Sequence, residues 1–201
     1  MLDTLIEAFS GAGAPFMYAI TAALAFGLAI LIERVWIFWI KWTLSSGTLL
    51  SALESGDLKT AGELNPSHPA CRLVRAGTDA TDAEAAWAAM GTEAPLVESE
   101  IQQRVPYLAT VGNLSTMLGL LGTVYGLIIA FSGLSDTSAV ETQTQLNEGI
   151  ATAMATTAWG LIVGIPALAL HTVLESKAAR LRALCEAAAA QVARHSGGSS
   201  S

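Results

Sequence analysis

The chain has 201 residues, of which 52% are hydrophobic and only 13% are charged. Soluble domains carry about a quarter charged residues, so this composition indicates a membrane protein. The net charge of −7, with no basic stripe, argues against nucleic-acid binding. The sequence contains no CxxC, HExxH, GxSxG or Walker motif, so we expect neither an enzyme nor a metal or cofactor site.

Residues 1–13 contain no Lys or Arg, and their apolar residues follow a helical spacing. We expect a short helix here on the outer membrane–water interface. Residues 14–40 form the first long apolar run, interrupted only by Glu33-Arg34. The acidic leading segment and the bulky apolar residues after Arg34 favour a transmembrane helix over a cleaved signal peptide. Trp36, Trp39 and Trp42 lie near its inner end, as an interfacial aromatic belt does.

Residues 41–104 are expected to form a cytoplasmic loop of short helices. Asn65-Pro66 and His68-Pro69 break these helices, because a residue before proline is disfavoured in helical conformation. A further helix is expected over Thr81–Ala89, with Thr81 as its N-cap and Glu84 completing a capping box. This loop is too small to be a separate catalytic domain.

Two long uncharged runs follow, in residues 105–135 and 149–174, separated by an acidic loop at residues 136–148. Each run exceeds the roughly 20 residues that cross a bilayer as a helix. Because they are longer than a bilayer requires, we expect both helices to project into the cytoplasm. The third helix is expected to continue as a cytoplasmic helix over residues 175–195, followed by a flexible tail at 196–201.

The basic residues predict the orientation. Residues 1–13 and 136–148 carry acidic but no basic side chains, whereas basic residues follow the first and third apolar runs. The positive-inside rule therefore places the N-terminus outside and the C-terminus inside. The predicted fold class is an all-α, polytopic membrane protein with three transmembrane helices and long cytoplasmic helical extensions.

Small and weakly polar residues follow one face of the second apolar run. Glycines recur every seven residues, and two threonines share their sector; these residues are Gly112, Gly119, Gly126, Thr116 and Thr123.

The third apolar run has a similar face. Thr157, Gly160 and Gly164 share it, and Thr152 and Thr156 lie on a neighbouring face. Pro166 removes a backbone hydrogen bond, which makes it a candidate site for a kink.

Two interpretations of these faces are open. Small residues let membrane helices approach closely and threonines bond across them, which is the interpretation that we prefer for the glycines. Alternatively, several copies with their threonines facing inward form a narrow pore. Neither apolar run contains a carboxylate, although a proton pathway normally needs an ionisable group at membrane depth. Either the chain moves no protons, or a partner helix supplies the carboxylate.

Two segments resemble signatures of the MotA/TolQ/ExbB proton-channel family. Residues 118–131 (LGLLGTVYGLIIAF) resemble its second-helix signature, and residues 150–167 (IATAMATTAWGLIVGIPA) resemble its third-helix signature. Three helices with an outside N-terminus are similar to the ExbB and TolQ branch.

The resemblance implies a homopentamer in the bacterial inner membrane whose second and third helices line a pore. It also implies an ExbD- or TolR-like single-helix subunit whose aspartate carries the proton. Thr123, Thr157 and Pro166 match family positions. The implied function is to couple proton-motive force to mechanical work on a TonB- or TolA-like periplasmic partner.

One position departs from the family pattern. A glutamate is usual five residues before the third-helix threonine, and this chain has Thr152 there. The proton route therefore differs locally, or the chain is a TolQ-like or gliding-motility-type stator. A passive oligomeric membrane scaffold, which would not need the threonines, is the alternative from another functional class.

Overall fold

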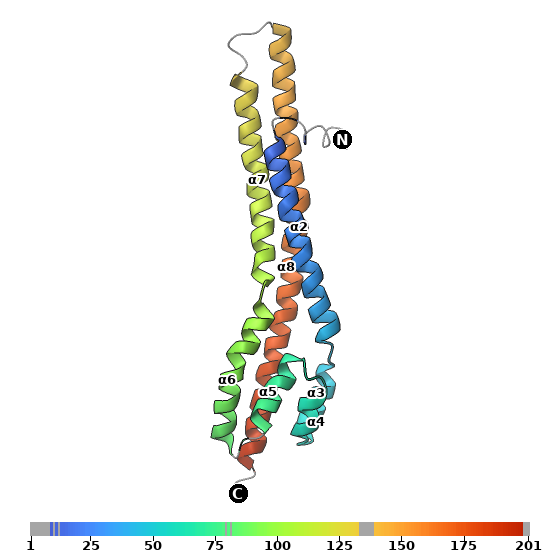
Figure 1. Cartoon of the computed structure of the whole chain (residues 1–201), viewed down its shortest axis with the longest axis vertical. Helices are drawn as coiled ribbons and strands as arrows, with labels where there is room; N and C mark the ends of the chain where they lie inside the picture. Colours follow the sequence, from blue (N-terminus) through green and yellow to red (C-terminus); the bar gives the residue numbers. More distant parts are fainter. Residues whose placement is uncertain are drawn as a thin grey trace. The chain divides into compact units, whose positions relative to one another are not determined.

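The computed structural model describes residues 9, 11, 13–78, 80, 82–132 and 139–198. Every regular element in these residues is helical (Figure 1). The elements are α2 (Ala14–Trp36), the π-helical turn η1 (Ile37–Lys41), α3 (Ser46–Glu54), α4 (Leu58–Glu63), α5 (Pro69–Thr78), α6 (Ala83–Gln102), α7 (Val105–Ser132) and α8 (Ala139–Gly198). The interfacial helix expected over residues 1–13 falls almost entirely outside the described residues.

Within the described residues, three helical stretches are long and apolar enough to cross a membrane. They are Ala14–Lys41, Ala83–Ser132 and Gln143–Ser196. The all-α class with three such helices is therefore confirmed.

Two sequence-based boundaries differ from the structure. α8 already begins at Ala139, so most of the expected loop at 136–148 is helical, and it continues to Gly198, so part of the expected tail at 196–201 is helical too. The helix also runs on through Pro166.

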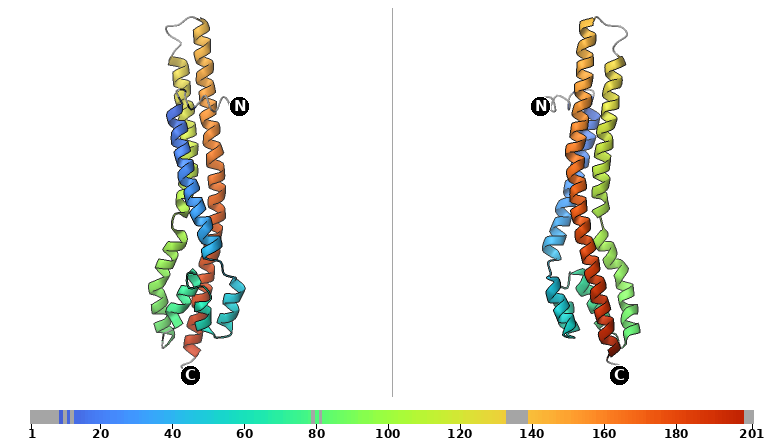
Figure 2. Two further views of the ribbon diagram at one scale, coloured as in Figure 1. Left: turned by 45° about the vertical axis from the view of Figure 1, so that its right-hand side comes forward. Right: turned by 180° about the vertical axis from the view of Figure 1, so that it is seen from behind.

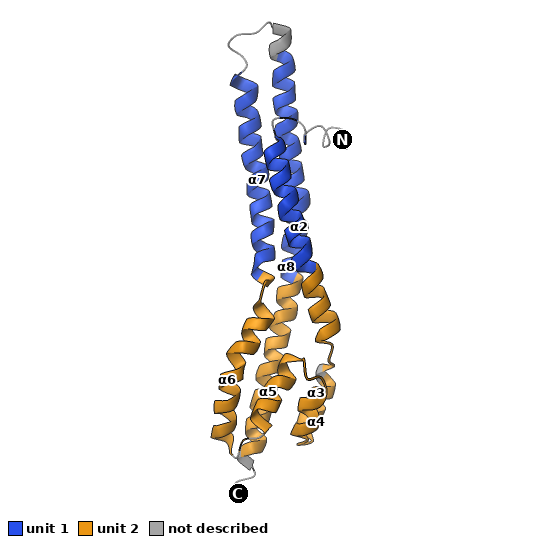
Figure 3. Ribbon diagram, in the orientation of Figure 1, with its two compact units in different colours: residues 1–31, 106–172 blue, residues 32–105, 173–201 orange. Residues whose placement is uncertain are grey.

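The chain divides into two compact units (Figure 3). The first, residues 1–31 and 106–172, contains most of α2, α7 and the first part of α8. Its three helices lie side by side in every view (Figures 1 and 2). The second, residues 32–105 and 173–201, contains the end of α2, η1, α3 to α6 and the last part of α8.

Short helices pack in sequence order within the second unit: α3 against α4, α4 against α5, and α5 against α6. Asp57 begins α4 by accepting a hydrogen bond from the Thr60 amide. Asp82 begins α6 in the same way, 2.8 Å from the Ala85 amide. Thr81, the expected N-cap, is outside the described residues, and the expected helix end at Ala89 is wrong because α6 continues to Gln102.

The cysteines of the second unit are both free and buried. Burial raises the pKa of the Cys71 thiol, which disfavours the reactive thiolate.

A buried arginine in the second unit binds the end of α6. Arg34 is only 1% exposed, and its guanidinium donates to the Glu100 carbonyl at 3.2 Å and to Gln103 Oε1 at 3.3 Å. The backbone then turns sharply at Arg104, whose φ is +64°, and Arg104 forms an ion pair with Glu33. A cation at a helix C-terminus satisfies unpaired carbonyls and opposes the helix dipole. Arg34 therefore stabilises the break between α6 and α7.

Candidate pore-forming face

α7 and α8 approach one another through glycines. A methyl group at Gly160 would lie only 2.7 Å from the Ser115 carbonyl oxygen and 3.0 Å from Gly119 Cα. A methyl group at Gly126 would lie 3.0 Å from the Gly149 carbonyl oxygen. These neighbours are backbone atoms, which no side-chain rotation can move away. The glycine pattern of the two helices therefore lies at their mutual contact within one chain.

The same contact continues toward the N-terminal end of α7. A methyl group at Gly112 would lie 3.1 Å from the Gly164 carbonyl oxygen, and one at Gly164 would lie 2.4 Å from Thr116 Oγ1. All five glycines singled out in the sequence thus belong to this α7–α8 seam.

α2 covers one side of the seam. A methyl group at Gly13, just before α2, would lie 2.6 Å from Thr152 Cγ2 and 3.1 Å from Thr156 Cγ2. Trp159 donates its indole N–H to Thr21 Oγ1 at 3.1 Å, which joins α8 to α2 again. Thr156 is completely buried here and donates to the Ala153 carbonyl at 2.9 Å.

Three threonines lie on the other side of the seam, away from α2. On a helix of 3.6 residues per turn, Thr116 and Thr123 follow Gly112 and Gly119 by one turn, on the side opposite Ser115 and Gly122. We call the surface that carries Thr116, Thr123 and Thr157 the open face. Thr116 is exposed, and the other two are half-buried.

Each hydroxyl of the open face donates to a backbone carbonyl. Thr157 bonds across the seam to Gly119 at 3.1 Å, whereas Thr116 bonds to Gly112 at 3.0 Å within α7. Thr123 bonds to Leu120, also within α7. Each oxygen therefore remains able to accept a hydrogen bond, but none carries a charge near neutral pH.

Large apolar side chains flank the open face. Leu120 of α7 is 64% exposed, and Met154 of α8 is 69% exposed. Together with the threonines they form a weakly polar strip within an apolar surface. Such a strip accommodates water or a partner helix, but by itself it supplies no group that titrates at membrane depth.

The structure thus separates the five candidate threonines into two groups. Thr116, Thr123 and Thr157 lie together on the open face, whereas Thr152 and Thr156 lie on the side of α8 that faces α2.

Pro166 lies in neither group. It borders a small aliphatic cavity of about 230 Å³ that α2, α7 and α8 line together.

Sequence reasoning missed three residues of the α2 side: Ser115, Trp159 and Thr21. Ser115 is completely buried, and its hydroxyl has no hydrogen-bond partner in the described part of the chain. The seven-residue spacing from Ser115 to Gly122 was the available signal for a second buried face of α7. The Trp159–Thr21 bond left no such signal, because it depends on how α2 packs.

Comparison with known proteins identifies relatives of this chain. The chain is 47% identical over 62 residues to the biopolymer transport protein exbB1 of Vibrio cholerae, covering 31% of this chain and 27% of that protein. It is 44% identical over 68 residues to the Tol-Pal system protein TolQ of Haemophilus influenzae, covering 34% and 29%. It is 36% identical over 86 residues to the biopolymer transport protein ExbB of Salmonella typhimurium, covering 43% and 35%.

These alignments span only about a third of the length of each relative. A broader match comes from the family model described as the MotA/TolQ/ExbB proton channel family, which covers residues 65–187. That range contains α7, the seam and the open face, and it is more than half of the chain. The chain therefore belongs to the MotA/TolQ/ExbB proton channel family, in its ExbB/TolQ branch.

Proposed function

We propose that this chain is an ExbB/TolQ-like subunit of a proton channel in the bacterial inner membrane. The channel couples proton-motive force to mechanical work on a periplasmic partner of the TonB or TolA kind. The observation that carries the proposal is the open face, where Thr116, Thr123 and Thr157 from two membrane helices lie together. Membership of the family supports it.

In this proposal five copies surround an axis with their open faces inward, N-terminus outside and C-terminus inside. The threonines then form a ring of hydrogen-bond acceptors in a narrow, mostly apolar passage. The α7–α8 seam serves as a rigid wall, since its backbone contacts leave little room for the helices to slide. α2 lies on the opposite side of the helix pair and contacts lipid.

The chain supplies no proton carrier in the passage. Residues 105–135 and 149–174 contain no Asp, Glu, Lys or Arg, His171 lies near the C-terminal end of the second range, away from the threonines, and hydroxyl groups do not ionise near neutral pH. An ExbD- or TolR-like single-helix subunit with a membrane aspartate supplies the carrier. The threonines solvate the aspartate and orient water next to it, which lowers the cost of an ionised carboxylate in the membrane.

The test uses the full chain co-expressed with the single-helix subunit encoded beside it. Native mass spectrometry of the detergent-purified complex is expected to give five copies of this chain and two of the partner. Thr157→Val and Thr123→Val are expected to reduce proton flux into vesicles at least tenfold, while the complex keeps its mass. Each change removes one hydroxyl at nearly constant volume.

Thr110→Val is the matched control. Thr110 is an exposed threonine of α7 that, among the described residues, bonds to the Pro106 carbonyl of its own helix alone, and it lies on the side of α7 away from α8. Its replacement is expected to leave proton flux unchanged. Normal flux in both Thr123 and Thr157 variants would contradict the proposed channel.

A passive oligomeric scaffold is the second candidate, and the seam favours it, because packing accounts for the glycines without a pore. Under that function the threonine variants keep all partner-dependent activity. Substitutions such as Gly119→Leu no longer discriminate, because Gly119 contacts α8 of the same chain and its replacement disrupts the subunit itself.

A further inference from the structure

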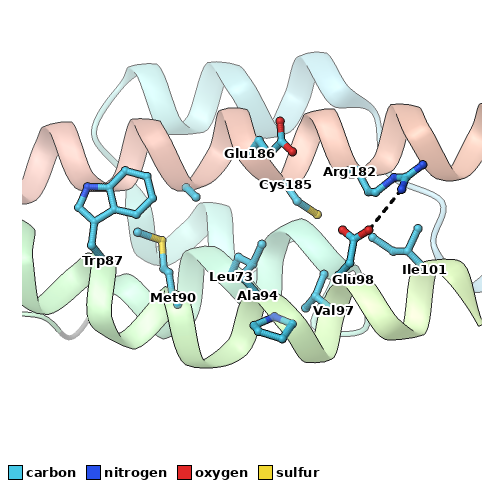
Figure 4. A pocket seen from close by; sticks show the side chains of 13 residues that line it. Leu73, Trp87, Met90, Ala94, Val97, Glu98, Ile101, Arg182, Cys185 and Glu186 are labelled. Atoms are coloured by element: carbon cyan, nitrogen blue, oxygen red, sulfur yellow. Dashed lines mark hydrogen bonds and ion pairs between the residues drawn. The ribbon is translucent and has the colours of Figure 1, made fainter.

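The second unit contains a groove of about 450 Å³ between α6 and the last part of α8 (Figure 4). Its walls are mainly apolar, with Trp87, Met90 and Val97 on α6 and Leu73 of α5 behind them. Trp87 is 53% exposed, which is unusual for so large an apolar side chain on a surface that faces water. The groove is a surface that a partner is expected to cover.

α6 has a local defect along the groove. Pro95 has no amide hydrogen, so the Gly91 carbonyl one turn earlier lacks its normal helical partner. Gly91 has no side chain, and apart from the backbone of its own helix no atom lies within 4 Å of the position where a Cβ would stand. The groove wall therefore has open space at Gly91.

One end of the groove is acidic. Glu98 of α6 pairs with Arg182 of α8 at 3.3 Å, and Glu186 lies one turn along α8 (Figure 4). Gln102 and Arg182 both donate to Glu98 Oε1. Two carboxylates and one guanidinium leave a net negative charge, which attracts a basic side chain.

A face of α8 that is exposed except at the half-buried Ala190 has the complementary character. It consists of residues spaced three and four apart, small in the middle and basic at both ends, and we call it the arginine–alanine face: Arg180, Ala183, Ala187, Ala190 and Arg194. Arg180 is two residues from Arg182 and so points to nearly the opposite side of the helix. One chain therefore cannot place its own arginine–alanine face in its own groove.

We infer that the groove of one subunit receives the arginine–alanine face of the next copy of this chain. The inference rests on the proposed oligomer and identifies its cytoplasmic contact. Arg180 reaches Glu98 of the neighbour, while Ala183 and Ala187 allow the helix to approach Val97 and Ala94 closely, and Ala190 lies level with Met90. The contact joins two different surfaces, and such head-to-tail contacts generate a closed ring when the rotation between neighbours closes, as the proposed five-fold arrangement requires.

The heights of these residues agree with a ring. Rotation about an axis parallel to α8 keeps each residue at its own height along that axis. Glu98 is level with Arg182, its ion-pair partner, and Arg180 lies only two residues from that level, or about 3 Å. α6 and α8 run antiparallel along the groove (Figure 4), so Ala94 is level with Glu186 and Ala187. The residues of the arginine–alanine face are thus level with the groove along its length.

Disulfide crosslinking between two differently tagged full-length chains tests the contact. One chain carries Ala94→Cys and the other Ala187→Cys, both with Cys71→Ala and Cys185→Ala, co-expressed in membranes and oxidised. The expected product is a dimer containing both tags, with no dimer of either chain with itself. Replacing Ala94→Cys by Thr92→Cys, an exposed position of α6 outside the groove, is expected to abolish it.

Native mass spectrometry of the same cysteine chains separates two kinds of failure. An intact oligomer without the mixed dimer would overturn this contact and leave the proposed channel standing. Loss of the oligomer in the wild-type chain would reject both. A crosslink from Ala94→Cys to the single-helix subunit instead would assign the groove to that partner and overturn the inference.

A charge reversal gives an independent readout. Arg180→Glu is expected to weaken the oligomer at least threefold in dilution, since it removes an ion pair at every contact. Arg194→Glu, the same change at the far end of the face, where α6 offers no acidic partner in the groove, is expected to have no effect. Equal effects of the two reversals would contradict the predicted Arg180–Glu98 pairing.

Discussion

The α7–α8 seam predicts that a single methyl group at Gly160 destabilises the protein. The Cβ of Gly160→Ala would stand 2.7 Å from the Ser115 carbonyl oxygen and 3.0 Å from Gly119 Cα. Ordinary contacts to a Cβ lie at 3.4–4 Å. The two helices must therefore separate by about 0.5–1 Å over this turn, since the opposing atoms belong to rigid backbone, and overpacking of this kind costs about 1–3 kcal/mol.

Separation also lengthens the Thr157–Gly119 hydrogen bond beyond its present 3.1 Å. A bond of this kind in a membrane protein contributes about 0.6 kcal/mol. Alanine has a higher helix propensity than glycine, and this difference stabilises the folded variant by at most about 1 kcal/mol. The net expectation is a loss of about 1–2 kcal/mol in the free energy of unfolding.

The assay is reversible unfolding of the purified full chain in detergent micelles, titrated with a denaturing detergent. Gly91→Ala is the matched control, because its Cβ meets nothing within 4 Å and the substitution gains helix propensity. We expect Gly91→Ala to be neutral or stabilising by up to about 1 kcal/mol. Equal stabilities of the two variants would refute the reasoning that backbone contact at the seam requires glycine.

Two further predictions concern the second unit. Arg34→Lys is expected to lower the free energy of unfolding by about 1–3 kcal/mol, because one ammonium group cannot replace the planar guanidinium that reaches two acceptors. Amide hydrogen exchange at the end of α6 should become faster in this variant. Arg75→Lys, on the exposed surface, should leave the exchange rate unchanged. His68 predicts a pH dependence, because burial and the nearby charge of Lys177 lower its pKa to about 4. The unfolded chain then binds the proton more tightly, so stability is complete above about pH 6.5 and falls by roughly 3 kcal/mol as the pH drops to 4. Unfolding titrations at pH 7 and pH 5 check this, and His68→Gln should flatten the difference; a wild-type stability that does not change between these pH values would contradict it.

His68 shows how local geometry supports that prediction. Its Nδ1 accepts a hydrogen bond from the Ala70 amide at 3.2 Å, at the beginning of α5. Protonation of Nδ1 would remove this acceptor and place a positive charge at a helix N-terminus. Both effects favour the neutral ring, in the same direction as burial.

The sequence by itself determined the membrane class, the three long apolar helices and the family. The membrane class and the helices follow from composition and run length, which depend little on packing. The family follows from the resemblance of residues 118–131 and 150–167 to its two signatures. The seven-residue glycine spacing also indicated a close helix contact. Local boundaries were less certain: acidic residues suggested a loop at 136–148, yet acidic side chains do not prevent a helix, and α8 begins at Ala139.

Only the tertiary structure decided which threonines share a surface. Periodicity places Thr152 and Thr156 on a face next to that of Thr157, but it does not say which of the two faces another helix covers. α2 covers the first two through Gly13, and Thr157 remains on the open face. Similarly, the sequence showed Arg34 only as a charge that interrupts an apolar run, and the structure shows that its guanidinium binds the end of α6. Both distinctions depend on contacts between segments far apart in the chain, which no local pattern encodes.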